Sequence, residues 1–280
     1  NKKNLIKKIV LEDNFRNNLE KLDLNFYLII FSKNFLFCTV DHISSFQLLY
    51  KITDKKIVIK DNLSELNFVS NQFARKTIIN SGYTLGAQTL SNSYKTLMPC
   101  EYIIYNNNKI EIDFYYNINF SYSKNLASES QFEKVIEKLF IRLKKNYGEN
   151  NIIVPISSGL DSRFILSALK YFGFKNVKLF THYFQNIRDK RIAKMLSQYF
   201  DYPIEFVNLK IKDSRNIYKS REFNEYKNYR QTQNVLNNHG DFISIFKLIK
   251  KKFININTDL IMNGQSGDFI SGNHIPLFLF

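Results

Sequence analysis

The residues best suited to chemistry in this chain form one short run, Ser157-Ser158-Gly159-Leu160-Asp161-Ser162. An apolar, β-branched stretch, 151–156, precedes the run, and Phe164 to Tyr171 has helical character after it. The run therefore lies at a helix N-terminus, where unpaired backbone N–H groups and the helix dipole converge on an anion. Gly159 permits a tight or positive-φ conformation and a close approach of the backbone to a ligand, and the serine hydroxyls add donors. The pattern predicts a phosphate site.

Asp161 indicates what kind of phosphate site this is. A carboxylate repels a bare polyphosphate, but a Mg²⁺ ion between the two turns the repulsion into a clamp. The run lacks the Gly-Lys-Ser/Thr ending of a Walker A loop. It resembles the S-G-G-x-D-S loop of the ATP pyrophosphatases, which cleave ATP between its α and β phosphates, with Ser158 in place of the first glycine. The alternative is a serine-rich turn in which Asp161 only caps the helix.

A second run of the same kind, Asn263-Gly264-Gln265-Ser266-Gly267-Asp268, follows the short apolar stretch Asp259 to Met262. If the two strands are neighbours, Asp161 and Asp268 point into one crevice and can share a Mg²⁺ ion with ATP oxygens. Taken alone, this run is equally compatible with an ordinary glycine turn that caps a helix.

The composition is that of a globular protein. In 280 residues, 44% are hydrophobic and 15% aromatic, which is enough for a substantial core and two domains. No apolar run is long enough to cross a bilayer. The two cysteines, Cys38 and Cys100, form neither a metal spacing nor a disulfide framework. We therefore expect them to be core residues of a protein in a reducing, cytoplasmic compartment.

The formal net charge of +15 raises the question of a nucleic-acid partner. The basic residues are dispersed, however, and the nearest approach to a patch is Lys247 to Lys252, with Lys144-Lys145 elsewhere. We interpret these lysines as solvated faces before polyanion contacts, so neither nucleic acid nor membrane is an expected partner. Because the chain starts at Asn1 and ends on the apolar residues 277–280, we expect it to be a piece of a longer protein.

The sequence predicts that the first part of the chain is mainly β-structure with one helix, over 64–80, and therefore α+β. Asn106-Asn107-Asn108 is suited to a hairpin turn, since asparagine tolerates the left-handed conformation. The polar stretch 117–130 marks the boundary to the second part. The expected strands are aromatic or β-branched runs: 25–30, 35–40, 56–59, 102–105 and 109–115.

The second part alternates between strands and helices. Ser130, three residues before Glu133, predicts a capping box at the start of a helix. Alternation of this kind favours a parallel sheet, whose ligands bind beyond the carboxyl ends of the strands. Apolar residues at helical spacing form one stripe of the first helix: Phe132, Val135, Ile136, Leu139, Phe140 and Leu143. The elements that follow are a strand over 151–156, a helix over 164–171, a strand over 177–183, a helix over 189–199 and strands over 204–209 and 259–262.

The chain resembles the asparagine synthetase family over nearly its whole length. The specific matches are Ser157 to Arg163 (SSGLDSR) with the pyrophosphate loop, Gly264 to Asp268 (GQSGD) with the G-E-G-G-D type loop, and Asp189 to Leu196 (DKRIAKML) with a helix. Weaker matches lie in 41–50 and 82–102. The resemblance implies that 126–280 is a C-terminally truncated α/β domain with a parallel sheet, of the adenine-nucleotide alpha-hydrolase-like (ATP pyrophosphatase) type. It implies that 1–125 is part of a β-rich amidotransferase-like domain of the N-terminal-nucleophile (Ntn) class.

The resemblance also implies residue roles. The amides of Ser157 to Ser162 would hold the β,γ-pyrophosphate, and Asp161 and Asp268 would hold Mg²⁺ and share the catalytic positions with Gln265. The other nucleotide contacts would be Ile156 beside the loop, Phe180, Thr181 and His182 at the edge of the adenine, and Asn263 and Gly264 on the α-phosphate side.

The implied reaction uses ATP and Mg²⁺ to amidate a small-molecule carboxylate. The acid attacks the α-phosphate, pyrophosphate leaves, and the acyl-adenylate reacts with ammonia, free or derived from glutamine, to give an amide and AMP. The sequence departs from the family pattern at two positions that bear on this reaction. Position one is Asn1, where the family's glutaminase has its nucleophilic Cys, and Gln265 replaces a Glu, so the acceptor is aspartate or another acid such as a sugar acid. A homodimer is compatible with this reading. A tRNA-modifying ATP pyrophosphatase and a non-catalytic nucleotide-binding module remain alternatives.

Overall fold

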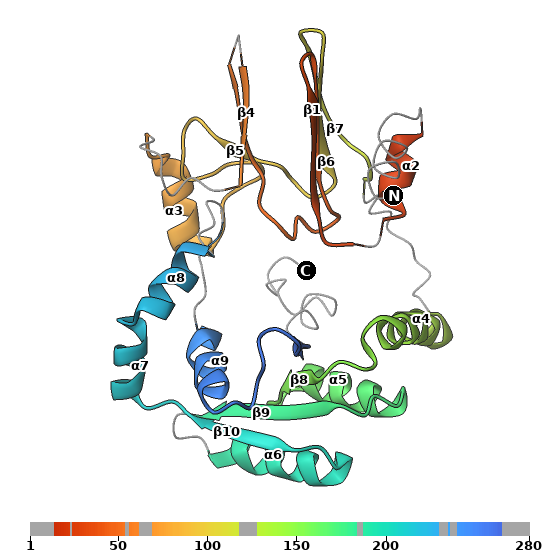
Figure 1. Ribbon diagram of the computed structural model, residues 1–280, viewed down its shortest axis with the longest axis vertical. Coiled ribbons are helices and arrows are strands. Elements are labelled where there is room, and N and C mark those ends of the chain that lie inside the picture. The colour runs from red at the N-terminus through yellow and green to blue at the C-terminus, as the bar shows by residue number, and fades with distance from the viewer. Residues whose placement is uncertain are drawn as a thin grey trace. The chain divides into compact units, whose positions relative to one another are not determined.

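The computed structural model describes residues 14–22, 24–53, 56–61, 69–117, 128–183, 187–229, 235 and 240–264. In these residues the fold is mixed α/β with three sheets, one of them parallel throughout (Figure 1). The chain divides into two compact units. Unit 1 comprises Asn1–Tyr122 and Glu225–Asn238, and unit 2 comprises Ser123–Asn224 and His239–Phe280.

Unit 1 contains a four-stranded antiparallel sheet in the order β1-β2-β6-β7. The sequence predicted all four strands and the turn between the last two. Asn107 and Asn108 have φ values of 46° and 66°, the left-handed pair that a two-residue hairpin turn requires. The strands are β1 (Tyr27–Ser32), β2 (Phe35–Val40), β6 (Glu101–Asn106) and β7 (Lys109–Phe114).

A second sheet of unit 1 has the order β4-β3-β5, and only β4 (Lys56–Lys60) was predicted. Strands β3 (Leu49–Thr53) and β5 (Lys95–Thr96) were not. The helices are α2 (Phe15–Glu20) and α3 (Gln72–Ser81). In the described residues α3 starts later than predicted, because Asn71 caps it by accepting a hydrogen bond from the backbone N–H of Ala74.

The four-stranded sheet has a hydrophobic cluster on each face. On one face, Leu19 of α2 packs with Phe37 and Tyr102. On the other, Cys38 and Ile103 pack with Tyr50 of the second sheet. Both cysteines are buried and unpaired, as expected, and burial raises the pKa of the Cys38 thiol to about 12. Neither thiol is in a setting that would make it a nucleophile.

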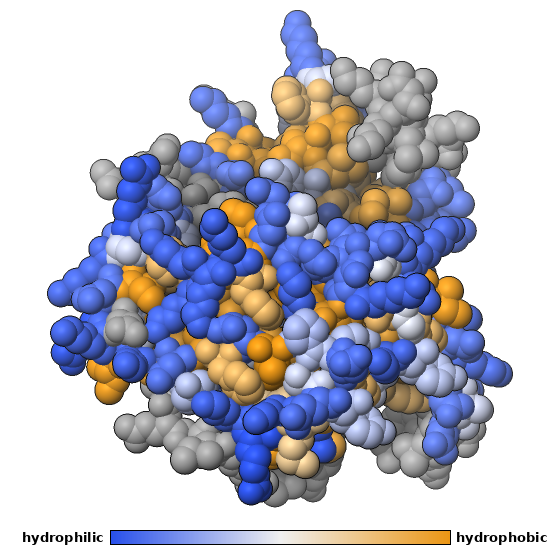
Figure 2. Space-filling view, turned by 60° about the horizontal axis from the view of Figure 1, so that its bottom comes forward, coloured by the Kyte–Doolittle hydropathy of each residue, from blue (hydrophilic) through white to orange (hydrophobic). Residues whose placement is uncertain are grey.

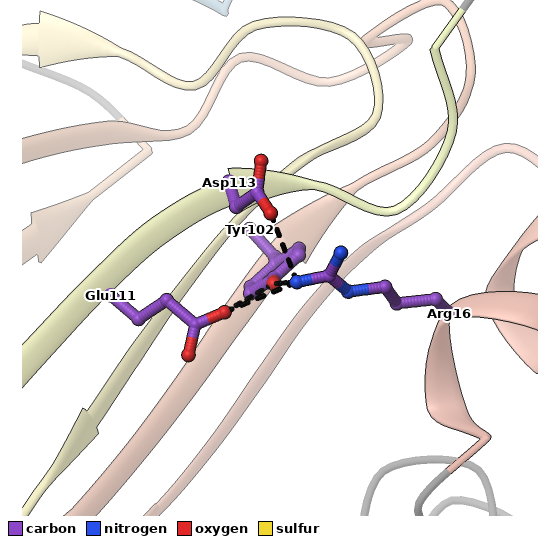
Figure 3. A network of polar contacts seen from close by, with 4 residues as sticks. All are labelled: Arg16, Tyr102, Glu111 and Asp113. Atoms are coloured by element: carbon purple, nitrogen blue, oxygen red, sulfur yellow. Dashed lines mark hydrogen bonds and ion pairs between the residues drawn. The ribbon is translucent and has the colours of Figure 1, made fainter.

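A polar network also fastens α2 to the sheet (Figure 3). The Arg16 guanidinium lies 2.9 Å from an oxygen of Asp113 and 3.3 Å from one of Glu111, and it donates to the Tyr102 hydroxyl. That hydroxyl in turn donates to Glu111 at 2.5 Å. The charged groups are about half exposed, so the network contributes modestly to stability, and it fixes how the helix lies on the sheet.

Unit 2 is built on the parallel sheet, in the order β10-β9-β8-β11. Its strands are β8 (Ile152–Pro155), β9 (Val177–Tyr183), β10 (Ile204–Asn208) and β11 (Leu260–Ile261). All four were predicted, β9 with its observed bounds. Since β8 comes first in the chain, the sheet grows outward on one side through β9 and β10, and the chain then returns to place β11 on the other side of β8.

Helices cover both faces of this sheet. Phe140, Leu166 and Ala193 lie in the cluster on one face, whereas Ile243 and Leu248 lie in the cluster on the other. The result is a three-layer α/β arrangement. None of the described helices combines the length and apolarity needed to cross a bilayer. The helices are α4 (Glu129–Tyr147), α5 (Leu160–Tyr171), α6 (Ile187–Phe200), α7 (Ile211–Tyr218), α8 (Arg221–Tyr229), which passes into unit 1, and α9 (Gly240–Lys250).

The capping box of α4 is real, but the predicted residues were wrong. Ser128 is the N-cap, its hydroxyl accepts from the Gln131 N–H, and the Gln131 side chain accepts from the Ser128 N–H. Ser130 lies inside the helix instead. Glutamine serves as well as glutamate at the third position, so the sequence offered two overlapping boxes.

Several lysines reach backbone carbonyls, and two of these lysines, Lys144 and Lys247, were predicted to lie on solvated faces. Lys144 donates to the Phe172 carbonyl at 2.6 Å, Lys170 to that of Phe200 at 2.8 Å, and Lys247 to that of Asn208 at 2.8 Å. These carbonyls end α5, α6 and β10, so the lysines satisfy terminal acceptors. Hydrophilic residues dominate the face of the molecule seen in Figure 2, with hydrophobic ones between them.

Candidate functional site at the β8–β11 switch point

The two motif-bearing strands are neighbours in the sheet. Leu260 and Ile261 of β11 pair in parallel with Ile152 and Ile153 of β8. This is the point at which the strand order reverses, and in open α/β sheets ligands bind outside the carboxyl ends of the strands at such a point. The condition that the sequence left open, adjacency of the two strands, is therefore met.

The first loop is shorter than predicted. Strand β8 ends at Pro155 and α5 begins at Leu160, not at Phe164, so Asp161 and Ser162 belong to the first helical turn. Gly159 is the N-cap with φ −70° and ψ 160°, an extended conformation open to any residue. Of the two conformations expected for Gly159, tight or positive-φ, the positive φ is therefore wrong. The glycine leaves room for the Ser157 hydroxyl, which would lie 3.2 Å from a Cβ at this position.

The serines hold this loop together from within. The buried Ser162 hydroxyl accepts from the Ser157 N–H at 3.2 Å and lies 3.2 Å from the Ser157 hydroxyl. The Ser157 hydroxyl accepts from the Gly159 N–H at 3.1 Å. Gly159 gives α5 no side-chain cap, so the amides of its first turn are available to another acceptor. An uncapped, serine-braced helix start suits an anion.

The second loop packs directly on this helix start. A Cβ on Gly264 would lie 2.7 Å from the carbonyl carbon of Asp161, 2.8 Å from its Cβ and 2.9 Å from its carbonyl oxygen. Only glycine allows this approach. The two predicted loops therefore meet at Gly264 and Asp161. Asn263 beside the contact is exposed, and Gln265 and Asp268 lie outside the described residues.

Two charged side chains border the first turn of α5. In the described part of the chain, the half-buried Asp161 carboxylate has neither a hydrogen bond nor an ion pair. Arg163 folds back toward the loop, and its Nε donates to the Gly159 carbonyl at 3.1 Å. The sequence interpretation missed Arg163, although its position four residues after Gly159 was a usable signal, because such spacing places it over the loop. A carboxylate suits a divalent cation and a guanidinium suits a phosphate.

The predicted adenine contacts lie at the carboxyl end of β9. The Ile156 N–H donates to the Phe180 carbonyl at 2.8 Å, which places the first loop beside this strand end. The side chains of Phe180 and Thr181 are buried, the former in a core cluster, and His182 is exposed. Their contacts with adenine remain predictions.

The described residues contain no group of three or more His, Cys, Asp or Glu side chains that could hold a metal ion by itself. Asp161 fits a Mg²⁺ ion whose other ligands are phosphate oxygens and water, a common arrangement for this cation. The pairing of Asp161 with Asp268 stays a prediction.

No family model matches the chain, and no curated protein is significantly similar to it. The resemblance to asparagine synthetases therefore depends on the motifs themselves and on their arrangement at the switch point.

Proposed function

We propose that unit 2 binds Mg·ATP at the β8–β11 switch point and that the protein is an asparagine-synthetase-like, AMP-forming ligase. It would adenylate a small carboxylic acid, release pyrophosphate and form an amide with ammonia. The observation that carries the proposal is the contact of Gly264 with Asp161. Two loops with the motifs of this chemistry come from distant parts of the sequence and need this contact for a shared site.

The proposal assigns a role to each group at the first loop. The amides at the start of α5 bind the pyrophosphate oxygens, and the helix dipole favours their charge. The Arg163 guanidinium neutralises charge that develops on the leaving pyrophosphate. Asp161 holds Mg²⁺, which when bound neutralises the phosphates and polarises them for attack. Ser157 and Ser162 keep the loop in shape, so that the reacting groups are aligned.

The nitrogen source in this proposal is ammonia, either free or derived from glutamine by a nucleophile other than Cys38 and Cys100. Both cysteines of the described residues are buried, and burial raises the pKa of Cys38 and of Cys100, so neither suits the nucleophile of a glutaminase. The acceptor acid, aspartate or another small acid, is open, and the assay therefore needs a panel of acids.

The test measures nucleotide affinity by titration calorimetry and pyrophosphate release with ammonia and candidate acids. Asp161→Asn should weaken Mg·ATP binding at least tenfold and abolish turnover, because the neutral amide does not hold the cation. A matched control is Asp201→Asn, which changes an exposed aspartate with a left-handed backbone that asparagine tolerates. The control should bind and turn over as the parent does.

Unchanged ATP-dependent turnover in Asp161→Asn would refute the assignment of this site. Retention of tRNA at physiological salt, with a steep salt dependence and no amide product, would favour a tRNA-modifying ATP pyrophosphatase. Nucleotide binding without pyrophosphate release from any acid would favour a non-catalytic nucleotide-binding module.

A further inference from the structure

The apolar stripe predicted for α4 divides into two ridges. Ile136, Phe140 and Leu143 pack into the core of unit 2. The other three side chains, which we call the apolar ridge, remain exposed: Phe132 by 53%, Val135 by 62% and Leu139 by 37%. Their spacing of three and four residues places them along one line of the helix. Unit 2 thus covers half of the apolar surface of α4 and leaves the other half to solvent.

A line of positive charge runs beside the apolar ridge. Successive residues of a helix are about 100° apart, which places these positive residues on the flank of the apolar ridge that lies away from the core. Glu133 and Glu137 fall on the opposite flank of α4, beyond the buried residues. All four positive residues are exposed. This basic ridge consists of Lys134, Lys138, Arg142 and Lys145.

The charges decide among the surfaces that could cover the apolar ridge. A second copy of α4 would bring a second basic ridge alongside the first, and like charges at that distance repel. A membrane needs a helix that is free to insert its whole apolar face, but half of the apolar face of α4 is packed into the core of unit 2. An acidic, helical protein segment meets both requirements, apolar contact and opposite charge.

We propose that α4 docks an amphipathic helix of a partner protein in which a line of apolar side chains is flanked by Asp or Glu. The basic ridge extends over about 16 Å, from a rise of about 1.5 Å per residue, so a partner helix of about three turns would match it. The partner would lie roughly along α4, with its apolar side chains between Phe132, Val135 and Leu139. This interaction does not depend on the proposed ligase activity.

The experiment uses the whole chain and two synthetic helical peptides with the same leucine line. One peptide carries glutamates at the flanking positions, and the other carries lysines. The acidic peptide should bind, and Lys134→Glu with Lys138→Glu should weaken that binding at least tenfold while creating binding of the basic peptide. The matched control, Lys175→Glu with Lys194→Glu, changes two other exposed lysines by the same total charge and should weaken binding less than threefold.

Equal loss of affinity in the two charge variants would overturn the proposal, because net charge would then explain the binding. Absence of acidic-peptide binding by the parent chain would overturn it as well. Two further results would also overturn the proposal. One is binding of anionic vesicles that is lost in the Lys134/Lys138 variant although peptide binding is unchanged. The other is dimerisation in sedimentation experiments that Val135→Asp abolishes. A circular dichroism spectrum and unfolding midpoint equal to those of the parent confirm that each variant is folded.

Discussion

Two aspartates that follow buried strands show how differently the two units use a carboxylate. In unit 1, Asp41 comes directly after β2 and is buried. Its oxygens accept from the backbone N–H groups of Phe26 at 2.8 Å, Ile43 at 3.0 Å and Ser45 at 3.1 Å. In unit 2, Asp161 follows β8 and has no such partner among the described residues.

The number of hydrogen-bond partners distinguishes Asp41, a structural carboxylate, from Asp161, which has none among the described residues. Asp41 closes its own turn, and its neighbours leave it no capacity for a ligand. Asp161 lies where a helix start has no side-chain cap and a second loop touches its backbone, and its carboxylate has no partner among the described residues. Polar groups left unsatisfied inside a structured site are better indicators of function than polar groups as such.

Removing the two carboxylates should change the free energy of unfolding by very different amounts. Asp41→Ala leaves the partly buried N–H groups of Phe26, Ile43 and Ser45 without this acceptor, so we expect a loss of about 1–3 kcal/mol in the free energy of unfolding. Asp161→Ala should change that free energy by less than about 0.5 kcal/mol. Urea unfolding followed by circular dichroism measures both. A large loss in Asp161→Ala would mean that this carboxylate is structural too.

The two glycines of the site provide the next comparison. Gly264→Ala forces a Cβ into the Asp161 backbone, so we expect a loss of about 1–3 kcal/mol, typical of overpacking, measured as a lower unfolding midpoint without ligand. Gly159→Ala should cost only about 0.5 kcal/mol, because φ is −70° and alanine is merely a poorer N-cap than glycine. Equal stability of the two variants would show that the loops do not touch.

The sequence predicted most of the parallel sheet because its strands are buried runs that need no partner to be recognised. β9 is such a run, and its bounds were predicted correctly. β3 and β5 were missed since their residues are mixed in polarity and they exist as strands through pairing: Leu49 with Thr96, Tyr50 with Lys95. Pairing over this separation is a tertiary effect that local propensity does not contain.

At the candidate site, the motifs pointed to two loops, but not to the contacts within and between them. Gly264 must be glycine because it lies against Asp161 of the loop after the neighbouring strand. No local sequence pattern contains this contact. One of the two conformations expected for Gly159, a positive φ, was wrong, and the bond from Arg163 to its carbonyl was missed. Spacing along a chain identifies a helix start, whereas through-space contacts need the fold.

The capping box allows a smaller test. Ser128→Ala should destabilise α4 by about 1 kcal/mol, because the hydroxyl accepts from Gln131. Ser130→Ala should have almost no effect, as alanine is a good helix former at an exposed position. Thermal unfolding of the two variants compares them, and a larger effect at Ser130 would restore the box that the sequence predicted.

The smallest expected effect is a pH dependence in unit 1. Burial raises the pKa of Glu101, and the bond from the Met98 N–H opposes this only in part. The folded state therefore favours the protonated acid, and this contribution to stability is lost as pH rises from the ordinary value through the raised pKa. Glu101→Gln should gain stability relative to the parent between pH 4 and pH 7. A constant difference across that range would argue against the shift.

Asp259, in the turn before β11, should behave in the opposite way. Burial raises its pKa, but hydrogen bonds from the Asn255 N–H, Asn151 and Thr258 outweigh burial and lower it overall. Its contribution to stability is present above the ordinary pKa and is lost as pH falls through the lowered one. Asp259→Asn should therefore be destabilised at pH 7 and approach the parent in acid, as urea midpoints across pH would report.

Some of the positive charges of this protein lie on lysines that donate to carbonyls at the ends of helices and strands. Lys144, Lys170 and Lys247 each donate to a backbone carbonyl oxygen, so part of the hydrogen-bonding capacity of their ammonium groups is already used. A reagent that acetylates free amines should modify them more slowly than Lys134 or Lys138. The three ammonium groups keep their charge and still count toward the formal value of +15, but each also holds the end of a helix or strand in place.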